Sequence, residues 1–218
     1  MGLQASEISV TRGGRLALTA PAFAIAPGEA ARLTGPNGAG KSTLLRALAG
    51  LLPLRSGDAS FKDVSLAKDR ETFAQEVAYA GHRDAVKPAL TVRENLAHWA
   101  AIYGGAGVDE ALERFSLTHI ADSPAAFCSA GQQRRLGLAR LMVLDRPIWL
   151  LDEPTVSLDV ASVGVFADLV AAHCAKGGLA IAATHIEIGL PDGPQIQLSP
   201  PTETATAEHD PFLAEGWT

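Results

Sequence analysis

The chain has 218 residues, of which 47% are hydrophobic and 19% charged, with a net charge of −6. This is enough apolar sequence for one core with a small satellite subdomain, and the acidic balance argues against a broad surface for nucleic acid. The two cysteines, Cys128 and Cys174, form no CxxC pair, which argues against zinc and favours a reducing compartment. No apolar run reaches the roughly 18 residues that cross a bilayer, so we expect no direct membrane insertion.

The first third of the chain predicts short strands followed by a strand–loop–helix unit. Residues 3–10 and 15–25 read as short strands around the turn RGGR. Residues 30–34 predict a buried strand that runs into GPNGAGKST and then into a helix with leucines and alanines at helical spacing. VAYAG, residues 77–81, predicts a further buried strand.

Residues 91 to about 144 predict a mostly helical region. Thr91 and Glu94 have the spacing of a capping box, which predicts a helix that starts after Thr91. VDEALERF predicts a second, amphipathic helix. Ser129 and Gln132 repeat the capping-box spacing in front of a third.

The last third returns to alternating strands and helices. Strands are predicted at 148–152 and 179–184, with a helix at 160–173 between them and a last short strand IQL. Strands that alternate with helices indicate a mainly parallel sheet covered on both faces. From Ser199 the chain is rich in Pro, Thr and Ala, and we expect a flexible tail over 199–218.

The segment GPNGAGKST, here called the phosphate loop, matches G-x-x-x-x-G-K-[ST] between a predicted strand and a predicted helix. Its glycines let backbone N–H groups turn inward around phosphates, and the helix N-terminus adds favourable partial charge. We expect Lys41 to reach the β- and γ-phosphates of ATP and the Ser42 hydroxyl to ligate Mg²⁺. An ordinary glycine-rich turn would need neither residue. The predicted nucleotide-binding residues are Gly35, Pro36, Asn37, Gly38, Ala39, Gly40, Lys41, Ser42 and Thr43.

Three polar residues follow two other buried strands. Asp152 ends the strand IWLLD and suits the shell of Mg²⁺, whereas Glu153 suits the polarisation of an attacking water. His185 follows LAIAAT and is placed to hydrogen-bond the γ-phosphate. Alone, two acids at a turn would be solvated charges and a single His a packing residue. Because parallel strand ends share one edge of a sheet, their combination with the phosphate loop favours a catalytic reading.

These motifs resemble those of the ATP-binding subunits of ABC transporters. GPNGAGKST resembles their Walker A motif, IWLLDEP their Walker B motif with its glutamate, SLD their D-loop and ATH their switch histidine; CSAGQ, residues 128–132, stands at the signature. The resemblance implies a P-loop ATPase fold of α/β class: a mainly parallel sheet core, an N-terminal antiparallel β subdomain and an inserted α-helical subdomain at about 88–144. The ATPase domain would span 1–198.

In this family the signature contacts the ATP bound to the phosphate loop of a second subunit. The resemblance therefore implies that Ser129, Gly131 and Gln132 bind nucleotide across a homodimer, at the N-terminus of a helix. Two ATP molecules would hold two copies together, and hydrolysis would release them.

The stretches 80–96 and 129–141 resemble the haem-exporter branch of the family, which serves cytochrome c maturation. That resemblance implies ATP-driven release of a haem–chaperone complex, CcmB-like and CcmC-like membrane subunits as partners, and a peripheral place on the cytoplasmic face of the bacterial inner membrane. His82 stands where most members have a Gln that contacts Mg²⁺ and the membrane partner. It either completes a metal set with Ser42 and Asp152 or only couples to the partner.

Some positions depart from the family pattern. Cys128 replaces the usual Leu of the signature, and we expect it to pack under the helix start. The aromatic residue that usually stacks on adenine is missing from residues 10–16, where Arg12 offers its guanidinium plane instead. Arg134 and Arg135 either extend a positively charged rim or brace the helix. We expect packing or surface roles for His98, His119 and His173.

Other functions fit the sequence less well. A GTPase switch requires an N/T-K-x-D motif, which is missing, and leaves CSAGQ without a role. A third possibility is a soluble ATPase of this family that serves DNA repair or iron–sulfur assembly. Repair types carry long coiled coils between their motifs, which this sequence lacks, and the acidic balance argues against DNA. The remaining alternative is an ABC transporter subunit for another substrate, which would differ only in its membrane partner.

Overall fold

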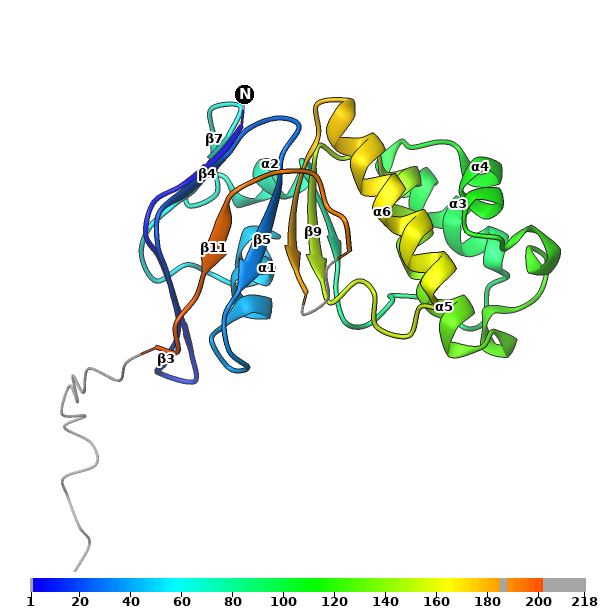
Figure 1. The fold of residues 1–218 in the computed structure, drawn as a ribbon, viewed down its shortest axis with the longest axis horizontal. Coiled ribbons are helices and arrows are strands. Elements are labelled where there is room, and N and C mark those ends of the chain that lie inside the picture. The colour runs from blue at the N-terminus through cyan, green and yellow to red at the C-terminus, as the bar shows by residue number, and fades with distance from the viewer. Residues whose placement is uncertain (1, 185–187, 202–218) are drawn as a thin grey trace, which may run out of the picture.

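The computed structural model describes residues 2–184 and 188–201 and has three parts (Figure 1). The N-terminal part is antiparallel, and the strands run in the order β4-β1-β6-β7 in its larger sheet. These strands are β1 (Leu3–Ala5), β4 (Phe23–Ile25), β6 (Ala59–Phe61) and β7 (Val64–Ser65). The other strands of this part, β2 (Ile8–Arg12) and β3 (Arg15–Ala20), form a hairpin.

The hairpin turns at the predicted RGGR segment. Gly13 and Gly14 both have positive φ, 55° and 75°, as a tight turn between two antiparallel strands requires. The predicted strand over 15–25 is interrupted between β3 and β4, at Pro21 and Ala22. Pro21 has no N–H to donate to a ladder, so the chain changes sheets at this point.

The central sheet has the order β11-β5-β10-β9-β8, and all its neighbouring strands are parallel. Its members are β5 (Ala30–Thr34), β8 (Val77–Ala80), β9 (Ile148–Asp152), β10 (Leu179–Ala183) and β11 (Gln195–Gln197). The predicted fold class is therefore confirmed: a mainly parallel sheet with an antiparallel β subdomain on one side. Both faces of this sheet are buried, which explains the almost uninterrupted apolar runs of β9 and β10.

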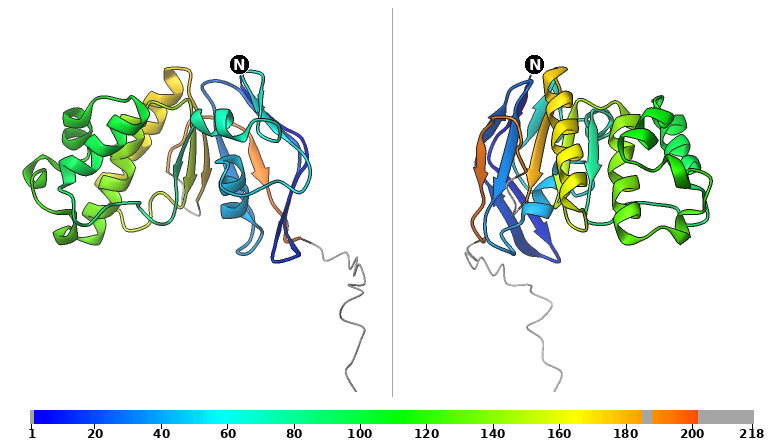
Figure 2. Two further views of the ribbon diagram at one scale, coloured as in Figure 1. Left: turned by 180° about the vertical axis from the view of Figure 1, so that it is seen from behind. Right: turned by 45° about the vertical axis from the view of Figure 1, so that its right-hand side comes forward.

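Alternate residues of β9 enter two different cores. Ile148 and Leu150 pack with α1 (Lys41–Leu48) and the N-terminal strands, whereas Trp149 and Leu151 pack on the side of α6 (Val160–Ala175). Figure 2 shows α6 between the sheet and the helical part of the chain. The sheet therefore fixes the phosphate loop, which precedes α1, relative to the acids that end β9.

The helical part consists of α3 (Val92–Tyr103), α4 (Val108–Arg114) and α5 (Ala130–Leu144), with short 3-10 turns at Thr118–Ile120 and Ala125–Phe127. Both predicted capping boxes are present, in front of α3 and α5. The short helix α2 (Arg70–Gln75) was not predicted, because it buries a single residue, Phe73, and shows no repeating apolar face. Within the described ranges, every helix is too short or too polar to cross a membrane.

Candidate functional site

The phosphate loop connects β5 to α1, as predicted. A Cβ on Gly40 would lie 2.9 Å from Leu18 Cδ1 and 3.0 Å from the Ala17 carbonyl oxygen, and its φ is 97°, so this position requires glycine. Gly40 is also the N-cap of α1 and offers no side chain to the N–H groups of the first turn. Those donors, together with the helix dipole, form an anion-binding end.

Lys41 lies over this loop. Its Nζ donates hydrogen bonds to the carbonyl oxygens of Gly35 and Pro36, at 2.7 and 3.2 Å. These carbonyl groups hold the ammonium group at the mouth of the loop. A phosphate oxygen can take their place as its hydrogen-bond acceptor. Arg12, expected to take the place of the adenine-stacking aromatic, is exposed at the end of β2.

Asp152 is the polar centre of the site. Its carboxylate is 3% exposed and accepts hydrogen bonds from Ser42 Oγ at 2.9 Å and from Tyr79 Oη at 3.2 Å. The Tyr79 hydroxyl in turn accepts a hydrogen bond from Arg46 Nε at 3.4 Å. Burial raises the pKa of Tyr79, so the phenol keeps its proton and acts as a donor to Asp152.

The Ser42 hydroxyl and the Asp152 carboxylate offer the hard oxygen ligands that Mg²⁺ prefers. Among the described residues no cluster of three or more His, Cys, Asp or Glu is arranged to hold a metal. His82, expected as a possible third ligand, is exposed in the loop after β8. The second Asp152 oxygen accepts the hydrogen bond from Tyr79.

Glu153 directly follows Asp152 and has a positive φ of 49°. Its N–H donates to the Ala183 carbonyl at 2.9 Å, which ties the turn after β9 to the end of β10. Its side chain is half-buried. The predicted switch residue, His185, lies outside the described residues.

The signature segment forms the start of α5. Ser129 Oγ accepts a hydrogen bond from the Gln132 N–H at 3.3 Å, and the Gln132 side chain accepts one from the Ser129 N–H at 2.8 Å. A Cβ on Gly131 would lie 3.3 Å from the Ser157 carbonyl oxygen, so the signature and the SLD segment are in close contact. Cys128 is half-buried against the core, as expected, and burial raises the pKa of its thiol.

The signature and the phosphate loop are at different places in one copy of the chain. Figure 1 shows the start of α5 in the helical part, with α6 and the central sheet between it and the loop before α1. Ser129 is exposed and Gly131 and Gln132 are half-exposed, beside a small hollow that also contains Asp159. Within one copy of the chain, the signature segment and the phosphate loop are therefore two separate surfaces.

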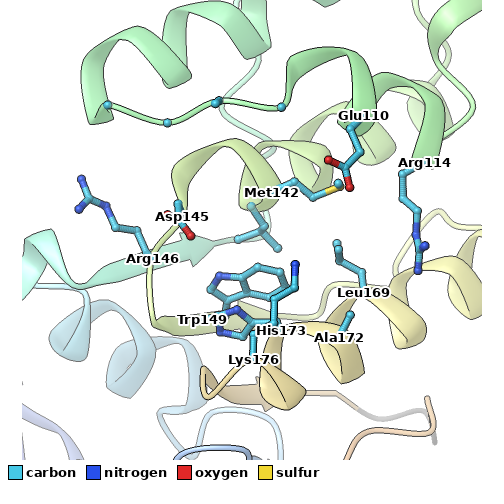
Figure 3. Close-up of a pocket in the computed structure, with 15 residues that line it drawn as sticks. Glu110, Arg114, Met142, Asp145, Arg146, Trp149, Leu169, Ala172, His173 and Lys176 are labelled. Atoms are coloured by element: carbon cyan, nitrogen blue, oxygen red, sulfur yellow. The ribbon is translucent and has the colours of Figure 1, made fainter.

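A cavity of about 460 Å³ lies near the other end of β9, between the end of α5, the loop before α4 and the end of α6 (Figure 3). The Trp149 and His173 rings stack in it at 3.8 Å and 7°. Trp149 is only 3% exposed, and burial lowers the pKa of His173. The pair joins α6 to the sheet, so His173 is a packing residue, as expected.

Sequence reasoning missed one residue of the site and left the role of a second open. Tyr79 was part of a predicted strand, and nothing in its alternation distinguishes a hydroxyl that reaches the next strand from an ordinary aromatic ring. Arg134 was left between a charged rim and a brace. It is buried, at 4% exposure, and braces α5.

The comparisons with known proteins agree with this geometry. A family model described as ABC transporter matches residues 18–156. The chain is 52% identical over 198 residues to the cytochrome c biogenesis ATP-binding export protein CcmA of Paracoccus denitrificans, which covers 91% of this chain and 89% of that protein. It is 51% identical over 190 residues to the protein of that name from Ruegeria pomeroyi, with 87% and 88% covered.

Solved structures show the same fold. An ATP-binding subunit of an ABC transporter superposes with a TM-score of 0.77 at 25% identity, over 88% of each chain. A dimeric ATP-binding cassette in a post-hydrolysis state, bound to ADP and Pi, superposes with a TM-score of 0.74 at 24% identity, over 84% of this chain and 88% of that chain.

Proposed function

The chain belongs to the ABC transporter family as an ATP-binding, ATP-hydrolysing subunit, and on that premise we propose that it works as a dimer to drive the haem-export complex of cytochrome c biogenesis. The observation that carries the ATPase is the 2.9 Å contact between Ser42 of the phosphate loop and Asp152 at the end of β9. The relatives named for cytochrome c biogenesis support the pathway. The alternative, another substrate, would change only the membrane partner.

In this proposal the residues from Gly35 to Thr43 bind the phosphates of ATP. Backbone N–H groups and the start of α1 surround them, and Lys41 gives up its carbonyl partners for phosphate oxygens. Ser42 and Asp152 would hold Mg²⁺, which supplies neutralisation of the phosphate charge. Tyr79 keeps the buried Asp152 carboxylate oriented toward the Ser42 hydroxyl.

Glu153 is the proposed general base. It is the next residue after Asp152 and is half-buried, so its carboxylate belongs to the same sheet edge as the phosphate loop. Its role is to accept the proton of the water that attacks the γ-phosphate. His185 is proposed to contact that phosphate, on the strength of the sequence alone.

The separation of the two half-sites supports a homodimer. Ser129, Gly131 and Gln132 have no nucleotide of their own to contact, because the phosphate loop of the same copy is on another part of the molecule (Figure 1). A second copy, placed head to tail, brings each signature onto the other's ATP. The dimeric neighbour of known structure shares the fold on which this arrangement depends.

A second surface fits the proposed membrane subunits of CcmB-like and CcmC-like kinds. Between the sheet and α3 lies a groove of about 380 Å³, lined by Leu51, Arg83, Trp99 and Tyr103 among others. Leu51 is 60% exposed and Tyr103 42%, and such apolar exposure is typical of a docking site. His82 precedes Arg83 and is exposed, so we propose that it contacts this partner. Docking there would place the chain on the cytoplasmic face of the inner membrane.

Two variants test the function. Glu153→Gln keeps the size of the side chain but removes its basicity, so steady-state ATP hydrolysis should fall by about 10²-fold or more while dimers with ATP persist in gel filtration. Wild-type turnover in this variant would refute the assigned base. Co-purification of the tagged chain with membrane proteins, identified by mass spectrometry, tests the pathway. Recovery with the subunits of a different transporter would favour the alternative substrate.

A further inference from the structure

Arg134 is a buried cation with an unusual set of partners. It lies five residues after Ser129 on α5 and is 4% exposed. Its Nε donates to the Pro154 carbonyl at 3.0 Å, its Nη2 to the Glu153 carbonyl at 2.6 Å, and its Nη1 to the Gly81 carbonyl at 3.0 Å and to Asp84 Oδ1 at 2.6 Å. These four contacts join α5 to the turn after β9 and to the loop after β8.

The contact to the Glu153 carbonyl bears on the catalytic turn. A non-glycine residue with φ of 49° persists only where its surroundings hold it in that conformation. Here the Glu153 N–H is fixed by Ala183 and its carbonyl by Arg134. Both backbone groups of the residue are thus held from neighbouring elements, which fixes the direction of its Cα–Cβ bond.

The loop after β8 is held in the same way. Asp84 forms an ion pair with Arg134, and its side chain is 23% exposed. A Cβ on Gly137, one turn further along α5, would lie 2.7 Å from Asp84 Cβ. Glycine at this position therefore leaves the space that lets Asp84 reach the guanidinium group.

We propose that Arg134 is a positioning residue of the ATPase: it aligns the Glu153 carboxylate by fixing the Glu153–Pro154 turn against the signature helix and the loop after β8. The inference rests on the proposed role of Glu153 as general base. Arginine suits this task because its planar group offers five donors in a fixed arrangement and stays charged. Lysine offers three donors from one atom and cannot reach all the acceptors that surround the edges of the planar guanidinium group.

A positioning role predicts a defect in turnover and not in nucleotide affinity. In the purified full-length chain, Arg134→Gln should lower kcat on the order of 10²-fold, the loss expected when a catalytic group is misplaced by about 1 Å. The affinity for a fluorescent ATP analogue should stay within about twofold, because the phosphate loop is on another element. Arg134→Lys should recover part of kcat. Arg93→Gln, which removes an arginine paired with Asp109 at the surface, is the matched control and should leave kcat unchanged.

A double-mutant cycle with Glu153→Gln separates positioning from general support of the fold. If Arg134 acts through Glu153, the double variant should hydrolyse ATP as slowly as Glu153→Gln alone, within about twofold. Multiplied defects, an unchanged kcat in Arg134→Gln, or a loss of affinity equal to the loss of kcat would each overturn the inference. If Glu153→Gln keeps its turnover, the assigned base is wrong instead. Should Arg134→Gln fail to fold, Asp84→Ala removes one contact of the four and enters the same cycle, with a smaller loss expected.

Discussion

Gly137→Ala is expected to destabilise the protein, although alanine is the better helix former. At a helix-interior position the exchange alone should stabilise by about 0.8–1.0 kcal/mol. Against this, the new Cβ would lie 2.7 Å from Asp84 Cβ and 2.9 Å from its Oδ1, so Asp84 must move away from α5.

The cost has two parts. Overpacking costs about 1–3 kcal/mol, and loss of the charged hydrogen bond from Arg134 to Asp84 about 1.5–3 kcal/mol. Because Asp84 is partly exposed and can relax toward solvent, we take the lower end of both and expect a net loss of about 1.5 kcal/mol. For a chain of this size the melting temperature should then fall by about 3–6 °C.

Gly164→Ala provides the control. Gly164 lies within α6, and a Cβ there would meet nothing within 4 Å, so the same exchange should raise the melting temperature by about 2–4 °C. Urea unfolding followed by circular dichroism measures both variants. The reasoning would be refuted if Gly137→Ala proved as stabilising as Gly164→Ala, since the Asp84 contact would then carry no cost.

Four further variants test other parts of the molecule. Lys41→Ala should abolish ATP binding, measured by equilibrium dialysis, whereas intact binding would remove Lys41 from the phosphate site. Ser129→Arg should abolish hydrolysis while the monomer still binds ATP with wild-type affinity; equal loss of both would contradict the cross-dimer role. His82→Ala should leave the Mg²⁺ dependence of hydrolysis unchanged, and a large shift would make His82 a metal ligand. Hydrogen bonds from the side chain and N–H of Thr72 lower the pKa of Asp69, the N-cap of α2, from 3.8. The ionised Asp69 carboxylate therefore stabilises the folded state above pH 3.8, and this stabilisation is lost as the pH falls through the lower pKa of the folded state. In urea unfolding measured at several acid pH values, Asp69→Asn should reduce the dependence of stability on pH. An unchanged dependence would argue against the cap.

Much of the fold follows from the sequence because its signals are local. The strand–loop–helix unit around Gly40 and the capping boxes at Thr91 and Ser129 depend on residues within four positions of each other. Parallel strands that are buried on both faces can also be predicted from the sequence, because they are apolar runs that end in polar residues. The meeting of Ser42 with Asp152 could be expected, since both follow strands of one parallel sheet.

The parts that could not be predicted depend on contacts between distant segments. Arg134 contacts carbonyl groups 19, 20 and 53 residues away, and backbone acceptors leave no trace in sequence. Tyr79 reaches Asp152 across 73 residues because their strands, β8 and β9, are neighbours in the sheet. That order of strands is a property of the assembled core, so the same tyrosine in another order would contact something else.

The position of Arg134 on α5 has a consequence for how two copies would work together. The N-cap of α5 is Ser129, which is proposed to contact the ATP of the other copy. Five residues later, about 7–8 Å along the axis, Arg134 holds the Glu153 carbonyl of its own copy. A helix turn is too stiff for these two ends to move independently. ATP binding at one site should therefore change the properties of the other site. Hydrolysis should then depend cooperatively on the ATP concentration, with a Hill coefficient between 1 and the number of sites, two. Loosening Arg134 should lower that coefficient, because the connection through α5 between the signature and the Glu153 turn would be weakened.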